Sequence, residues 1–119
     1  MLLIDAHLDL SMNALEWNRD LRANIHDIND REKHLTDKPD RGNATVSLDE
    51  LRKGNVGIVV ATQIARYVTP DSTLPGWNSP EQAWAQTQGQ LAYYKALERT
   101  GDLRPIRNQS ELKDHLMQW

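Results

Sequence analysis

The alternation of apolar and polar residues at the start of the chain predicts a β-strand over Leu2–Leu10. Every even position is apolar, whereas the odd positions become polar after the first one. These polar residues are Asp5, His7 and Asp9. Because successive side chains of a strand point to opposite faces, one face is apolar and the other becomes polar toward the carboxyl end. The pattern is typical of a strand that packs against helices on one side and borders a polar site on the other.

A second strand is predicted over residues 56–65, where an almost continuous, β-branched apolar run indicates a parallel strand buried on both faces. Before it, a capping box at Ser47–Glu50 predicts a short helix that ends at Gly54 in the left-handed conformation. After it, a second capping box at Ser79–Gln82, with proline at the first helical position, predicts a long helix that ends at Gly101.

The segments between these elements are more polar and less regular. We expect residues 11–22 to be helical or irregular, and residues 24–45 to form a long excursion with one short helix. Residues 103–106 are predicted to form a short strand, and residues 108–119 a last helix. This alternation of strands and helices indicates βα units, a parallel sheet and an α/β fold class.

Composition narrows the class of protein. The 119 residues include 17 acidic and 14 basic side chains, and the most charged stretch, residues 19–41, has no net sign. These features exclude a typical nucleic-acid binder and a polybasic membrane anchor. The absence of cysteine excludes disulfides, thiolate metal sites and a cysteine nucleophile. With no basic leader and no apolar run near the ~20 residues that span a membrane, we expect a cytoplasmic protein.

The most informative constellation is His7-Leu8-Asp9. A spacing of two on a strand points an imidazole and a carboxylate the same way, close enough to share one metal ion, and both are standard zinc ligands. The alternative is a chance pair that forms a structural hydrogen bond. Asp5 lies one step deeper on the same face, where it either orients His7 or forms an ion pair.

Two aromatic residues follow the ends of the predicted strands. Trp17 and Tyr67 could therefore line a substrate pocket, although core or loop anchoring is the alternative for both. Three other histidines are expected to be surface residues: His26, His34 and His115. The chain contains no dinucleotide fingerprint, no P-loop and no nucleophile elbow.

Several of these segments resemble one known family in the same order along the chain. Leu3–Leu10 resembles the opening of the membrane (renal) dipeptidase family of the amidohydrolase superfamily, which reads Asp-Gly-His-x-Asp-Leu at the end of its first barrel strand. Leu51–Gly57 is similar to the second landmark of that family, Leu-x-x-Gly-x-Val-Gly. The helix over 83–97, with Gln90 to Tyr94, looks like that of the bacterial branch. The one departure within the first motif is Ala6 in place of glycine.

The resemblance implies a (β/α)8 barrel of the TIM type, of which residues 1–119 would be the N-terminal third. It implies zinc-dependent hydrolysis of dipeptides by a site with two zinc ions, one of them held by His7 and Asp9. The bridging glutamate, the remaining histidine ligands and the acid/base aspartate of the family would all lie beyond Trp119. We therefore expect no catalytic residue within this chain, and no activity from the chain alone.

The partners expected from this resemblance are a dipeptide or similar small substrate, and either a homo-oligomer or the remainder of the barrel. Two alternatives stay open. One is another amidohydrolase chemistry, such as a deaminase or lactonase, although those branches commonly carry His-x-His. The other is a non-catalytic fragment or binding module that needs a partner to complete its sheet.

Overall fold

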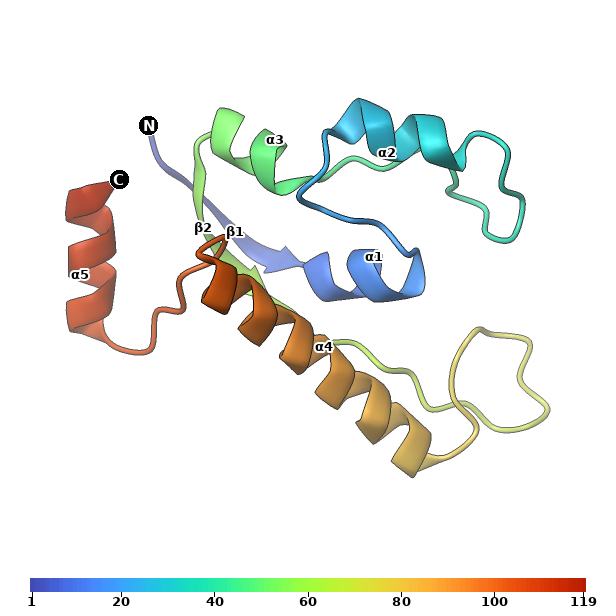
Figure 1. Ribbon diagram of the computed structural model, residues 1–119. Helices are drawn as coiled ribbons and strands as arrows, with labels where there is room; N and C mark the ends of the chain where they lie inside the picture. The colour runs from blue at the N-terminus through green and yellow to red at the C-terminus, as the bar shows by residue number, and fades with distance from the viewer.

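The computed structural model describes all residues from 1 to 119 and confirms the α/β class. The elements in chain order are β1 (Leu3–Leu8), α1 (Leu10–Glu16), α2 (Ile25–Glu32), α3 (Leu48–Lys53), β2 (Val56–Ala61), α4 (Pro80–Thr100) and α5 (Gln109–Gln118). The two strands pair in parallel as a two-stranded sheet. In Figure 1 the sheet lies in the middle, with α2 and α3 above it, α4 below it and α5 apart at one end.

Side-chain caps explain where four of the helices begin. Each cap accepts a hydrogen bond from an amide two or three residues further on, at 2.8 to 3.3 Å. The capping residues are Asn24, Ser47, Ser79 and Asn108. These contacts satisfy amides that have no partner inside the helix. The predicted helix starts after Ser47 and Ser79 are confirmed, as is the end of α4 at Gly101, whose φ is 79°.

The predicted end of α3 is wrong in one detail. Gly54 has a φ of −76°, so it does not adopt the left-handed conformation expected there. That conformation belongs to the next residue, Asn55, with a φ of 56°. Asparagine tolerates this region better than most residues.

The prediction for the second strand is wrong in its length and in its burial. β2 ends at Ala61, four residues before the predicted end, because the backbone at Ile64 bonds instead to the Gln90 side chain of α4, at 2.7 and 2.6 Å. The strand was expected to be buried on both faces, but its residues are half-buried or exposed, and Val60 is 54% exposed. Only β1 pairs with β2, so the further strands and helices that would bury both faces of β2 are absent from this structure.

The short strand predicted over 103–106 does not form. The amide of Leu103 instead bonds to the carbonyl of Leu97, which closes the end of α4. Pro105 has no amide to offer to a sheet. The helix predicted after this segment is confirmed as α5.

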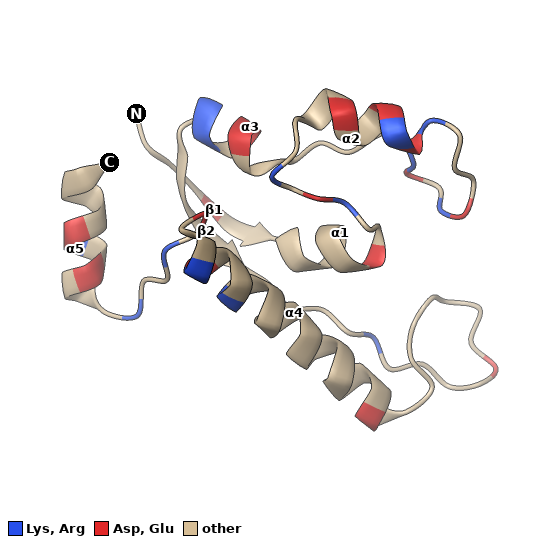
Figure 2. Cartoon of the chain, in the orientation of Figure 1, with Lys and Arg blue, Asp and Glu red and all other residues tan.

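The excursion between α1 and α3 is ordered by a buried charge network. Glu32 of α2 accepts two hydrogen bonds from Arg19, at 2.8 and 2.9 Å, and one from Arg41 at 2.8 Å. The amide of Gly42 bonds to the same carboxylate at 3.0 Å. Figure 2 shows charges of both signs along α2 and the loop that follows it. The predicted short helix within this segment is confirmed as α2.

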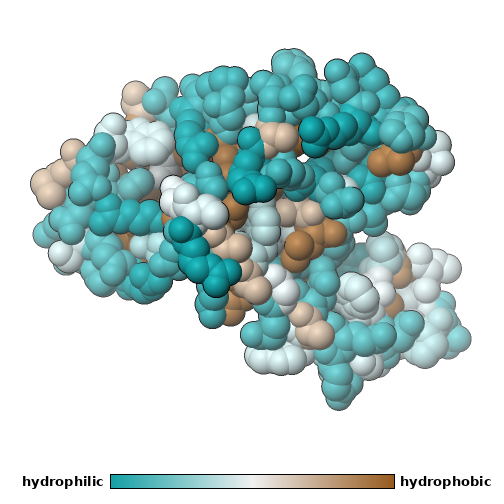
Figure 3. Space-filling model, viewed as in Figure 1, coloured by the Kyte–Doolittle hydropathy of each residue, from teal (hydrophilic) through white to brown (hydrophobic).

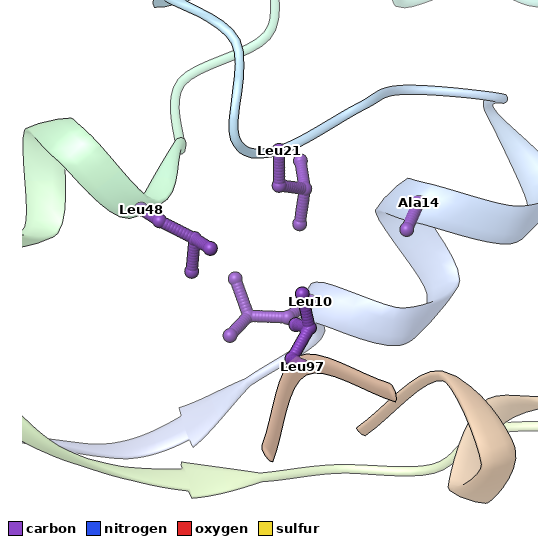
Figure 4. Packing of buried hydrophobic residues seen from close by; sticks show 5 residues of the cluster. All are labelled: Leu10, Ala14, Leu21, Leu48 and Leu97. Carbon is purple, nitrogen blue, oxygen red and sulfur yellow. The ribbon is translucent and has the colours of Figure 1, made fainter. Parts of the chain in front are cut away.

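The hydrophobic core is small and lies where three helices approach the sheet. Its cluster is drawn in Figure 4 and consists of Leu10 and Ala14 of α1, Leu21, Leu48 of α3 and Leu97 of α4. Only 13 of the 119 residues are buried, so much of the apolar surface of the sheet and helices faces solvent. Figure 3 shows apolar side chains at the surface in the middle of this face. No helix combines the length and apolar character needed to cross a membrane.

Candidate metal site

The candidate ligands lie at the carboxyl edge of the sheet. β1 ends at Leu8 and β2 at Ala61, so Asp9 and Thr62 are each the first residue after a strand. Because the strands are parallel, these two residues meet at the same edge, where the active sites of βα folds are found. His7 lies two residues before Asp9, near the end of β1.

The structure brings His7 and Asp9 together. Nε2 of His7 lies 3.3 Å from Oδ1 of Asp9, and the two side chains are 70% and 33% exposed. Two donors bound at ~2.0 to 2.1 Å to a tetrahedral zinc are about 3.3 Å apart, so the observed separation fits shared ligation. The same distance is at the long end for a hydrogen bond. The donor types, one imidazole and one carboxylate, also match zinc.

The Asp9 carboxylate is not used to stabilise its own helix. Asp9 is the N-cap residue of α1, a position where aspartate normally accepts a hydrogen bond from the first turn. Its side chain makes no such bond. Instead, Oδ1 accepts a hydrogen bond from the hydroxyl of Thr62. The carboxylate is therefore held toward the edge of the sheet, beside His7.

Asp5 makes neither of the two contacts considered for it. Its carboxylate accepts a hydrogen bond from the backbone amide of His7 at 2.9 Å. It forms no ion pair and no hydrogen bond to the imidazole, so its effect is to restrain the backbone at His7.

The pair supplies two of the ligands that a metal site requires. No group of three or more histidine, cysteine or acidic side chains within residues 1–119 is arranged to hold a metal. His26 and His34 are exposed on the excursion, as expected. The expectation for His115 is wrong: it is half-buried, because α5 folds back and places its Nε2 2.7 Å from the carbonyl oxygen of Gly57 in β2.

A buried polar junction supports this edge of the sheet. The carbonyl of Thr62 accepts hydrogen bonds from the hydroxyls of Tyr94 at 2.7 Å and Ser11 at 3.1 Å. Ser11 and Gln90 have no exposed surface, and Gln90 holds both backbone groups of Ile64. The junction joins the start of α1, the end of β2 and the middle of α4.

Sequence reasoning did not assign a role to Ser11, Thr62 or Gln90. A signal was present, because Ser11 and Thr62 are small hydroxyl residues within three positions of a strand end. Gln90 and Tyr94 are also four residues apart, on one side of a helix. The sequence pattern does not show that the two strand ends and α4 lie against one another.

The structure places Trp17 away from the candidate ligands. Its ring lies 4.9 Å from Nζ of Lys38, and it borders a hollow of about 360 Å³ that also includes Arg19 and Arg41 but neither His7 nor Asp9. Tyr67 is 54% exposed and forms an isolated bridge with Trp77 within the loop before α4. A role for these two residues in a substrate pocket stays a prediction.

The chain matches no protein-family model, no curated protein and no solved structure. A functional assignment therefore depends on the residues and the geometry described above.

Proposed function

We propose that the chain is the N-terminal part of a zinc-dependent dipeptidase that resembles the membrane dipeptidase family, with His7 and Asp9 holding one of two zinc ions. The observation that carries this proposal is the 3.3 Å separation of His7 Nε2 and Asp9 Oδ1 at the carboxyl edge of two parallel strands. The two-stranded sheet would be the first part of a (β/α)8 barrel, whose active site occupies that edge.

Each residue of the pair has a defined task in this proposal. His7 would donate the lone pair of Nε2, and Asp9 would supply one carboxylate oxygen. When bound at such a site, zinc polarises a peptide carbonyl and lowers the pKa of a water molecule, which is the chemistry that peptide hydrolysis requires. The remaining ligands and the acid/base group would come from protein outside residues 1–119, so the chain alone should hydrolyse no dipeptide.

The proposal is tested on the native protein that carries these residues. His7→Ala and Asp9→Ala should each lower its zinc content and abolish dipeptide hydrolysis, because each removes a ligand. Metal content is measured by mass spectrometry of the desalted protein, and hydrolysis with a panel of dipeptides. His34→Ala is the matched control, since it removes an exposed imidazole in the loop after α2, where it is not paired with Asp9. Full zinc content and turnover in the His7 and Asp9 variants would contradict the proposal.

A second candidate is a non-catalytic module that binds a partner through its open sheet. The observation that favours it is an apolar groove of about 850 Å³ bordered by β2, α3, α4 and α5. In the dipeptidase proposal, further strands and helices of the barrel would cover this groove. A native protein with no bound metal and no hydrolysis of dipeptides, deaminase substrates or lactones would favour the binding module.

A further inference from the structure

We propose that the Thr62 hydroxyl is a positioning group that holds the Asp9 carboxylate in the orientation in which it can share a metal ion with His7. This inference rests on the proposed function and extends it to a residue on the second strand. Thr62 is 53 residues from Asp9 in the sequence, yet its Oγ1 contacts Oδ1 of Asp9, the same oxygen that faces His7.

The hydroxyl of Thr62 has one hydrogen and two possible acceptors. Oγ1 lies 3.2 Å from the carbonyl oxygen of Leu8 as well as against the Asp9 carboxylate. The Leu8 carbonyl already accepts the backbone amide of Thr62 at 3.2 Å. A hydrogen bond to an ionised carboxylate is shorter and stronger than one to a neutral carbonyl. The hydrogen therefore goes to Asp9.

Thr62 can act as a rigid support because its backbone is held on both sides. Its amide is bonded to β1, and its carbonyl accepts from Tyr94 and Ser11. Ser11 is fully buried and its hydroxyl also lies 3.3 Å from Oε1 of Gln90. The hydroxyl of Thr62 is thus attached to a backbone that is fixed by the buried polar junction between α1, β2 and α4.

Asp9 has no other restraint that could replace this contact. Its carboxylate does not cap α1, and the side chain of His7 beside it is 70% exposed, so few contacts hold that side chain in place. Without the Thr62 hydroxyl, the carboxylate should populate several side-chain rotamers, and only some of them place Oδ1 beside His7 Nε2. Loss of an outer partner of a metal ligand typically lowers metal affinity by about 10- to 100-fold.

The test compares Thr62→Val, which keeps the shape but removes the hydroxyl, with Thr62→Ser, which keeps the hydroxyl. Thr87→Val is the matched control, because the Thr87 hydroxyl bonds only to a carbonyl within α4. Two measurements are made by NMR on the native protein that carries these residues, with aspartate and histidine selectively labelled. Three-bond couplings report the rotamers of Asp9 without metal, and a Zn²⁺ titration of the His7 imidazole signals reports affinity.

We expect one dominant Asp9 rotamer in the wild type, averaged rotamers in Thr62→Val, and recovery in Thr62→Ser. The apparent Kd for Zn²⁺ should rise about 10-fold or more in Thr62→Val and stay near the wild-type value in the other two variants. Unchanged rotamers and an unchanged Kd in Thr62→Val would overturn the inference. So would equal losses in the Val and Ser variants, since these would indicate packing rather than the hydroxyl.

The two proposals fail in different ways. If the wild-type imidazole signals do not respond to Zn²⁺, the assignment of His7 and Asp9 as ligands fails, whereas the metal-free couplings still decide whether Thr62 orients Asp9. If the wild type binds Zn²⁺ and Thr62→Val binds it equally well, only the positioning role fails.

Discussion

At the scale of single residues, a large electrostatic effect lies at Glu32 in the excursion. The Arg19 guanidinium, which donates two hydrogen bonds to it, lowers the pKa of Glu32 to about 2 from an ordinary value of 4.5, against the opposing effect of burial. The amide of Gly42 and the side chain of Arg41 act in the same direction. The folded state therefore favours the ionised carboxylate.

This difference in pKa makes the stability of the fold depend on pH. Because the folded-state pKa lies below the unfolded value, the stabilisation is fully present above pH 4.5 and is lost as the pH falls toward 2. The full difference corresponds to about 3 kcal/mol. We expect urea unfolding of the wild type to show a free energy that declines over this range of pH.

Glu32→Gln should remove the contribution of Glu32 to this dependence. It should lower the stability at pH 7 by about 3 kcal/mol or more, because the buried Arg19 guanidinium loses its anion and Arg41 keeps only Asp37. Asp30→Asn is the control on the same helix, since Asp30 pairs with Lys33 where both side chains are more than 60% exposed. It should change stability by less than about 1 kcal/mol. A wild-type free energy that is constant from pH 5 to about pH 2 would contradict the folded-state pKa.

Contacts of the candidate site could be predicted from the sequence only where the two residues are close together along the chain. His7 and Asp9 were found because their relation is local, two positions apart on one strand. The Thr62 contact with Asp9 spans 53 residues and the Ser11 contact with Gln90 spans 79, so neither follows from periodicity. The residues that hold the site in place therefore emerge only from the fold.

At the scale of elements, one glycine within α4 and the glycine that ends it have opposite conformational requirements. Gly89 lies within the helix, and a Cβ there would meet no atom within 4 Å. Gly101 follows the last turn with a φ of 79°, a conformation that strains any residue with a side chain. The same substitution at these two positions should have effects of opposite sign.

Gly89→Ala should stabilise the chain by about 0.5 to 1 kcal/mol, because alanine loses less backbone entropy on forming a helix. Gly101→Ala should destabilise it by about 1 kcal/mol, because the left-handed conformation is costly for alanine. Both free energies are measured by urea unfolding. A loss of stability in Gly89→Ala would contradict the open space around this position.

The helices were predicted more accurately than the strands for a physical reason. A helix satisfies its own backbone, so the caps at Ser47 and Ser79 mark its start within a few residues. The backbone hydrogen bonds of a strand are made to neighbouring strands. The apolar run at 56–65 does not show how long the neighbouring strand is. β2 ends at Ala61, which pairs with Leu8, the last residue of β1, and beyond it the backbone of Ile64 bonds to the side chain of Gln90.

At the scale of the whole molecule, the chain is more open than a compact domain of its size. Its accessible surface is 8043 Å², whereas about 6,600 Å² is expected for a monomer of this mass. Its radius of gyration is 16.0 Å against about 13.5 Å for a compact chain. Both values agree with a two-stranded sheet whose groove and outer edges have no cover within the chain.

We expect the isolated 119-residue chain to cover this surface by self-association. Open strand edges next to exposed apolar side chains favour pairing between copies. Light scattering after size exclusion should therefore give a mass above 13.6 kDa that rises with concentration. Val60 is the informative position, since it lies on β2, borders the groove and is 54% exposed.

Val60→Lys should shift the chain toward the monomer, because a lysine ammonium cannot be buried against another copy without losing its hydration. Leu74→Lys is the matched control: Leu74 is 59% exposed, but it lies in the loop before α4 and does not border the groove. It should leave the mass unchanged. A monomeric wild type at every concentration would contradict this prediction, and equal effects of the two substitutions would show that association follows general apolar exposure rather than the open side of β2.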